Sequence, residues 1–201
     1  MKCYKLTDKN YMTQNNTKWG KDVTHRIKDI DKDAILCSKH WLHAYKDPYI
    51  AILMNPIHAN IKKPVMFESK AEGLIKKDNQ LKLGCTKLTT IKRIRVPKLT
   101  TKQRIEIAIR CVKVVYKNKK WNKWANNWLN GKDRTKTSAH AAYAAYSAAA
   151  AAYSAAAAAY VDAADYAAYA AYAAYAADAV ADAADSEKLN LKKIIYDVIN
   201  K

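Results

Sequence analysis

The feature that most constrains the fold is an alanine-rich tract from Ser138 to Asp185. Twenty-nine of its 48 residues are alanine, the residue with the highest helix propensity. As one helix the tract would be about 72 Å long, which is too long for a chain of 201 residues. We therefore expect it to fold back near Tyr160–Asp162, because Asp162 is a good N-cap. This gives two helices, at about 138–160 and 162–185.

The tyrosines of this tract indicate how its helices pack. Three of them recur every seven residues along one helix face, and four more recur every three residues from 166 to 175. The alanines between them let neighbouring backbones approach closely, which favours a tight helical bundle. A tyrosine-lined binding groove is the alternative, and its candidate residues are Tyr146, Tyr153, Tyr160, Tyr169 and Tyr172.

Amphipathic spacing predicts three further helices, at about 101–117, 121–130 and 189–200. Thr100 and Gln103 have the spacing of a capping box at the start of the first. Asn130–Gly131 supplies the C-cap of the second. Residues 98–201 are therefore expected to be helical throughout.

Residues 1–97 have a different pattern, typical of short strands and one helix. Alternation predicts strands near residues 4–6, 64–68, 81–85 and 94–96. Asp47–Pro48 is expected to start a short helix, Tyr49 to Met54, and Asn55–Pro56 to stop it. No element is predicted for residues 9–33. The fold class is thus α+β: a small mixed α/β domain (1–97) followed by an Ala/Tyr-rich helical bundle (98–201).

Charge is divided along the chain in the same way. The formal net charge is +18, and residues 1–137 carry +21, whereas the tract 138–185 carries −5. This surplus favours an anionic partner, a nucleic acid or a nucleotide-like ligand. The alternative is a solvated basic surface, with the acidic helices docked on it.

The densest basic and aromatic segment runs from Arg110 to Lys136, where Trp121, Trp124 and Trp128 alternate with lysines. Lysines would neutralise phosphates, and an exposed ring would stack on a base. The competing interpretation places all three rings in the core, because they share one helix face. The candidate contacts to an anionic partner are Lys92, Arg93, Arg95, Arg110, Lys113, Lys117, Lys120, Lys123 and Arg134.

Several classes of function lack support. No Walker loop, Rossmann glycine set, HExxH or GxSxG occurs. Cys37, His40 and His43 are zinc-ligand types, with Cys85 or His58 as a fourth, but their spacing is not that of paired zinc ligands. We expect no metal, no cofactor and no catalytic residue.

The chain shows no apolar stretch typical of a membrane span and no signal-peptide core at its start. Four scattered cysteines predict thiols in a reducing compartment. We therefore expect a cytoplasmic protein, in the host cytoplasm if phage-encoded, with no membrane partner. A homo-oligomer stays open, because the tyrosine face suits a dimer as well as an internal hairpin.

The segments RIEIAIRCVKV (104–114) and WNKWANNWLNG (121–131), followed by the Ala/Tyr repeats, resemble the Ala-rich helical domain of immunity proteins, which also occurs in phage and prophage proteins. Members of that family more often have Arg, His or Trp where this chain has Tyr. The resemblance spans about residues 100–185. It implies a phage-type accessory protein that binds without chemistry and interferes with host defence, an immunity-like protein-binding module, or a structural virion component.

The N-terminal part offers a second resemblance. Leu36–Cys37, Trp41–Tyr45, Asp47–Pro48 and Ala51 are similar to N-terminal domains of phage accessory proteins, whose layout is distantly similar to ADP-ribosyltransferase-like folds. The catalytic Arg/His, Ser/Tyr and Glu set of those enzymes has no matching positions here. Transferase activity is therefore the less favoured alternative. If it is present, the protein should turn over NAD, and changing His43 or Glu68 should abolish that turnover.

Overall fold

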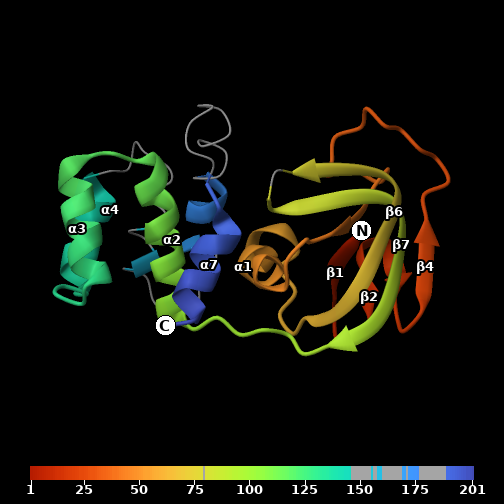
Figure 1. Cartoon of the computed structure of the whole chain (residues 1–201), viewed down its shortest axis with the longest axis horizontal. Coiled ribbons are helices and arrows are strands. Elements are labelled where there is room, and N and C mark those ends of the chain that lie inside the picture. The colour runs from red at the N-terminus through yellow and green to blue at the C-terminus, as the bar shows by residue number, and fades with distance from the viewer. Residues whose placement is uncertain (79, 146–154, 156–157, 160–168, 171, 177–188) are drawn as a thin grey trace. The chain divides into compact units, whose positions relative to one another are not determined.

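The computed structural model describes residues 1–78, 80–145, 155, 158–159, 169–170, 172–176 and 189–201. Contacts divide the chain into two compact units, Met1–Lys98 and Leu99–Lys201. The described residues form both helices and an antiparallel sheet (Figure 1), so the α+β class is confirmed.

The N-terminal unit is built on a five-stranded antiparallel sheet. Its strands are β1 (Lys2–Thr7), β4 (Val23–Arg26), β5 (Leu42–Ala44), β6 (Val65–Asp78) and β7 (Lys82–Ile94). β6 and β7 form a long curved hairpin (Figure 1), with β1 on the outer side of β6 and both β4 and β5 on β7. Tyr4 and Tyr45 exchange backbone hydrogen bonds of 2.7 and 2.9 Å, so β1, β6, β7 and the end of β5 close into a ring.

The hairpin is longer than the strands that alternation predicts. Pairing shifts register between Glu68 and Ser69 and again between Glu72 and Ile75. Such bulges break the period-two pattern, so the sequence shows only fragments of each strand. At the second bulge Gly73 has φ 76°, and a Cβ there would lie 2.2 Å from Thr86 Oγ1, which explains the glycine.

The structure adds elements to residues 9–33, where none is predicted, and the predicted end of the first helix is wrong. Residues 9–33 contain β2 (Met12–Thr13), the 3₁₀ turn η1 (Gln14–Asn16), β3 (Thr17–Lys18) and β4. The helix α1 (Pro48–His58) passes through Pro56 instead of stopping before it. Asn55 forms the hydrogen bonds at the end of this helix. Its backbone carbonyl accepts from Ala59 N, and its side-chain amide donates to Ile61 O and accepts from Ile61 N.

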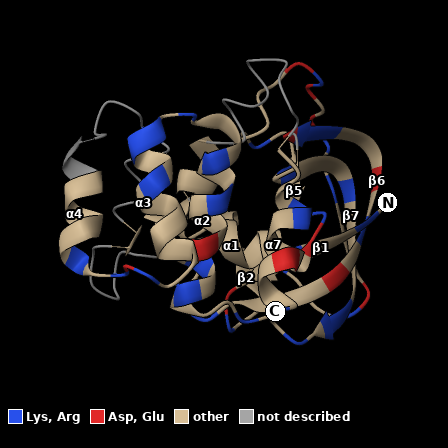
Figure 2. Cartoon of the chain, turned by 60° about the vertical axis from the view of Figure 1, so that its left-hand side comes forward, with Lys and Arg blue, Asp and Glu red and all other residues tan. Residues whose placement is uncertain are grey.

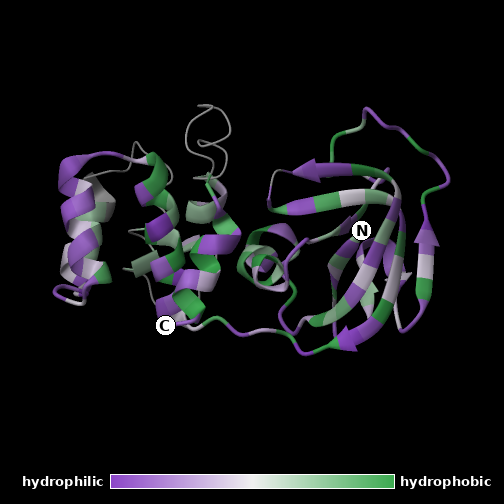
Figure 3. Ribbon diagram, in the orientation of Figure 1, coloured by the Kyte–Doolittle hydropathy of each residue, from purple (hydrophilic) through white to green (hydrophobic). Residues whose placement is uncertain are grey.

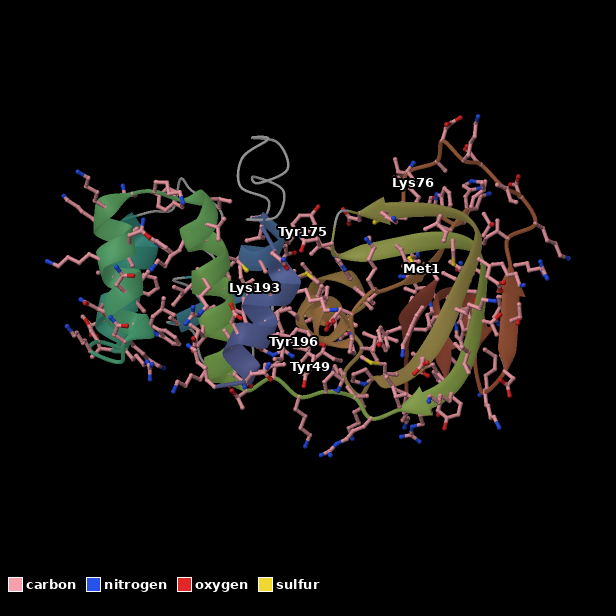
Figure 4. The ribbon with its side chains drawn as sticks, in the orientation of Figure 1. Met1, Tyr49, Lys76, Tyr175, Lys193 and Tyr196 are labelled. Carbon is pink, nitrogen blue, oxygen red and sulfur yellow. The ribbon has the colours of Figure 1, made fainter. Side chains whose placement is uncertain are left out.

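The start of α1 agrees with the sequence, since Pro48 is the first helical residue and Asp47 is the cap. The Asp47 carboxylate accepts from Tyr49 N at 2.9 Å and Ile50 N at 3.2 Å. Elsewhere in the unit the N-terminal ammonium of Met1 donates to Ala71 O at 2.7 Å, and Lys76 of β6 donates to Ala34 O at 2.7 Å (both residues are labelled in Figure 4).

The C-terminal unit contains α2 (Thr101–Val115), α3 (Lys119–Leu129), α4 (Lys136–Ala145) and α7 (Leu191–Ile199). The capping box of Thr100 and Gln103 is present, and Gly131 with φ 76° follows the Asn130 C-cap. The final helix starts two residues later than predicted, because Asn190 caps it by accepting from Lys193 N at 2.9 Å. On α7, Lys193 also pairs with Asp197 at 2.6 Å, near Tyr196 (Figure 4).

One apolar core joins α2, α3 and α4. Ile105, Ala108, Ile109 and Val112 of α2 pack in the same cluster as the tryptophans of α3 and Ala139 of α4. From the alanine-rich tract beyond α4, the described buried residues in this cluster are Ala155, Ala158, Ala170 and Ala173. The expected turn at 160–162, and with it Tyr146, Tyr153 and Tyr160, lies outside the described residues.

None of the helices in the described part of the chain is long and apolar enough to cross a membrane.

Candidate anion-binding surface

Five lysines gather where α2 ends and α3 begins. Residues 116–118 link the two helices, and Asn118 caps α3 by accepting from Lys120 N at 3.0 Å and Trp121 N at 3.1 Å. Because this link is so short, the last turn of α2 and the first turn of α3 lie at the same end of the unit (Figure 1). We call the following residues the lysine cluster: Lys113, Lys117, Lys119, Lys120 and Lys123.

The cluster lacks charge compensation among the described residues. No carboxylate there lies within ion-pair distance of any of its ammonium groups, and α3 contains no acidic residue. Lys113 donates to Asn126 Oδ1, and Lys117 donates to Lys113 O at 3.4 Å, both neutral acceptors. Blue segments accordingly mark α2 and α3 in Figure 2. Partial burial and the neighbouring Arg110 lower the pKa of Lys113, as expected where cations crowd.

The positions of two cluster residues are unfavourable for the helix itself. Lys119 and Lys120 lie in the first turn of α3, at the positive end of the helix dipole. A cation there costs about 0.3 to 1 kcal/mol. Cations retained at a cost to helix stability suggest a role outside folding.

The tryptophans of α3 point the other way, into the core. Trp121, Trp124 and Trp128 are 0, 9 and 4% exposed, which confirms their assignment to the core and excludes these rings as a stacking surface. The exposed residues of α3 are lysines and asparagines, and Figure 3 shows this helix largely in purple. The indole N–H groups of Trp121 and Trp124 are buried and meet no acceptor in the described part of the chain.

Two residues predicted to contact an anionic partner, Arg110 and Arg134, bond to groups within the C-terminal unit instead. Arg110 donates to Glu106 at 2.8 and 2.9 Å, and this carboxylate also binds Lys201. Arg134 donates to Trp128 O at 2.8 Å and Leu129 O at 3.3 Å, the carbonyls at the end of α3, and lies over the Trp128 ring. Exposed carbonyls at a helix end attract cations, so Arg134 serves α3.

The remaining predicted cations lie in the other unit, at the end of β7 and just beyond it. Lys92 is 3.8 Å from Glu68. Arg93 and Arg95 are exposed and have no acidic partner within the described ranges. The structure thus brings together Lys113, Lys117, Lys120 and Lys123, with Lys119 in addition. Arg110 and Arg134 are bound within the same unit, and Lys92, Arg93 and Arg95 belong to the other unit.

The tyrosine groove is described only in part. Tyr169 is half-buried against the core of the C-terminal unit, and Tyr172 is 53% exposed. These two therefore have different surroundings.

The cysteine and histidine motif forms a local structural network. His40 contacts Asp29 O at 3.0 Å, His43 contacts Leu36 O, and Lys82 donates to Cys37 Sγ at 2.7 Å. Within the described residues no group of three or more His, Cys, Asp or Glu is arranged to hold a metal. None of the four cysteines is in a disulfide.

Sequence reasoning missed a buried cation, Lys5 of β1. It is 8% exposed, donates to His43 O at 2.8 Å, and lies 4.9 Å from the Trp19 ring centre. Burial lowers its pKa to about 8. Burial also raises the pKa of Cys3 to about 12 and of Cys85 to about 11, so neither neighbouring thiol supplies a counter-charge at neutral pH.

No family model, curated protein or solved structure matches the chain. The resemblances to immunity proteins and phage accessory proteins therefore stay predictions.

Proposed function

We propose that this chain is a binding protein, without catalysis, that holds nucleic acid through the lysine cluster. The supporting observation is five cations at one helix junction with no carboxylate partner among the described residues. Phosphates would replace water and counterions around these ammonium groups, and release of those counterions would drive binding. Nucleic acid is favoured over a nucleotide-like ligand, because Lys117, Lys119, Lys120 and Lys123 are exposed on the helix surface.

The setting follows from the resemblance. A phage-type accessory protein that occupies nucleic acid would keep host defence proteins from it. The proposal also includes the helical bundle: the buried alanines of the tract share a core with α2, α3 and α4, as they would if the tract packed as further helices of one bundle.

Binding can be tested by fluorescence anisotropy with a labelled 30-base-pair DNA duplex and with its single strand, between 50 and 300 mM salt. Five phosphate contacts predict a slope of log K against log salt of about −4.5 on the duplex. The variant K119E/K120E/K123E should bind at least tenfold more weakly at 100 mM salt, with a slope near −2.

The control variant is K9E/K21E/K62E, which changes the net charge equally at exposed lysines of the other unit. It should keep most of the affinity. The proposal is contradicted if neither DNA binds, if binding does not depend on salt, or if the two variants lose equal affinity.

A second candidate, a protein-binding module, rests on the exposed ring of Tyr172. If it is correct, Tyr172→Ser should abolish a stoichiometric complex with a protein partner while K119E/K120E/K123E leaves that complex intact. The reverse pattern would favour nucleic acid.

A further inference from the structure

We infer that the partner of the lysine cluster is double-stranded DNA, contacted through its phosphates without base stacking. This inference rests on the proposed function and narrows it. Exposed aromatic side chains decide whether a protein can hold unpaired bases by stacking.

Proteins that hold single strands combine a basic groove with exposed rings, and each stacked base contributes about 1 to 3 kcal/mol. This chain has five tryptophans and one phenylalanine. Trp19, Trp41, Trp121, Trp124, Trp128 and Phe67 are all buried. The tryptophan and phenylalanine rings are thus buried, and the exposed tyrosine rings among the described residues, Tyr172 and Tyr175, belong to the alanine-rich tract and not to α2 or α3.

The lysine cluster itself offers no ring. Tyr116, in the link, is half-buried, with its ring edge against Trp121 at 5.8 Å between ring centres. The exposed surface of α3 holds Lys119, Lys120, Lys123, Asn126 and Asn130. This surface supplies ammonium and amide groups, which suit phosphates and groove edges.

Charge density then favours the duplex. B-form DNA carries one phosphate charge per about 1.7 Å of axis, roughly twice that of a single strand. The eleven residues of α3 span about 16 Å, and a B-form major groove about 12 Å wide admits one such helix. Without stacking to compensate, a single strand has only the weaker electrostatic attraction.

The test compares the same labelled 30-base-pair duplex and single strand at 100 mM salt, with tryptophan fluorescence recorded in parallel. The duplex should bind at least tenfold more tightly, and tryptophan fluorescence should stay unchanged at saturation because no indole meets a base. Equal or tighter binding of the single strand, or strong tryptophan quenching by it, would overturn this inference and leave the proposed function standing. Failure of both DNAs to bind would overturn the proposed function itself.

A designed variant sharpens the comparison. Lys123→Trp exchanges one exposed cation for an exposed ring on the same helix face. It should weaken duplex binding and strengthen single-strand binding relative to the wild type, which moves the ratio of the two affinities toward one. A Lys123→Ala control should weaken both and keep the preference for the duplex. If Lys123→Trp and Lys123→Ala change the affinities for both DNAs equally, an added ring does not favour the single strand. The preference of the wild type for the duplex would then not come from a lack of stacking, and the inference fails.

Discussion

Replacing Lys5 by methionine should stabilise the protein at neutral pH. The ammonium is buried among neutral groups, and its pKa is lowered from 10.5 to about 8. At 1.36 kcal/mol per pKa unit, holding this charge in the folded state costs about 3 kcal/mol. Methionine fills a similar volume but loses the hydrogen bond to His43 O, which is worth about 1 kcal/mol. The expected net gain in the free energy of unfolding is about 2 kcal/mol at pH 7.

The pH dependence gives a sharper signature than the absolute stability. Because the folded pKa of Lys5 lies below the unfolded one, the penalty is fully present below pH 8. It disappears as pH rises toward 10.5, where the unfolded chain also loses its proton. The advantage of Lys5→Met should therefore shrink steadily between pH 8 and 10. Urea denaturation at pH 7, 8, 9 and 10 measures this difference.

Lys9→Met is the matched control, since Lys9 is exposed near the end of the same strand. It should leave both stability and its pH dependence unchanged. If Lys5→Met destabilises the protein at pH 7 and its difference from the wild type stays constant up to pH 10, then Lys5 is not a buried uncompensated charge and the reasoning is refuted.

Three further predictions concern other residues. Native protein should present one thiol to Ellman's reagent, Cys37, because Cys3, Cys85 and Cys111 are buried; Cys37→Ser should remove that reaction, and fast labelling of a second thiol would contradict the packing. Arg134→Ala should lower the free energy of unfolding by about 1 to 2 kcal/mol, through loss of its bonds to Trp128 O and Leu129 O and of its contact with the Trp128 ring. The same variant should cost little DNA affinity, and a tenfold loss would return Arg134 to the binding surface. Glu106→Gln should destabilise the protein at pH 7 and reduce its sensitivity to acid. Burial alone would raise the pKa of Glu106, but the bonds from Lys201 and Arg110 outweigh burial and lower that pKa. The ionised carboxylate therefore stabilises the fold above its unfolded pKa, and this stabilisation is lost as pH falls through the folded pKa. Unfolding curves from pH 3 to 7 measure this, and an acid response identical to that of the wild type would contradict the role of the ion pairs.

The sequence predicts those parts of the fold that depend on neighbouring residues. The start of α1 at Asp47–Pro48, the capping box of α2 and the C-cap of α3 each involve residues within four positions of one another, and all three are present. The burial of Trp121, Trp124 and Trp128 follows from the same local spacing.

The errors come from contacts that the periodicity of helices and strands does not show. The bulges in β6 depend on its pairing with β7, and the continuation of α1 past Pro56 depends on Asn55 meeting Ile61. Lys5 offers one sequence signal, because it lies between Cys3 and Thr7 in the alternation of β1, but a lysine in that position is normally taken as solvent-facing. Among the candidate site residues, composition alone does not separate Arg134, bound to helix carbonyls, from the uncompensated lysines of the cluster.

Lysine footprinting tests the central claim most directly. The full chain is acetylated at low reagent concentration with and without saturating duplex DNA, and the modified lysines are identified by mass spectrometry. The account predicts protection of Lys117, Lys119, Lys120 and Lys123, with unchanged reactivity at Lys9, Lys21 and Lys62. Uniform protection of all exposed lysines, or protection confined to the N-terminal unit, would contradict it.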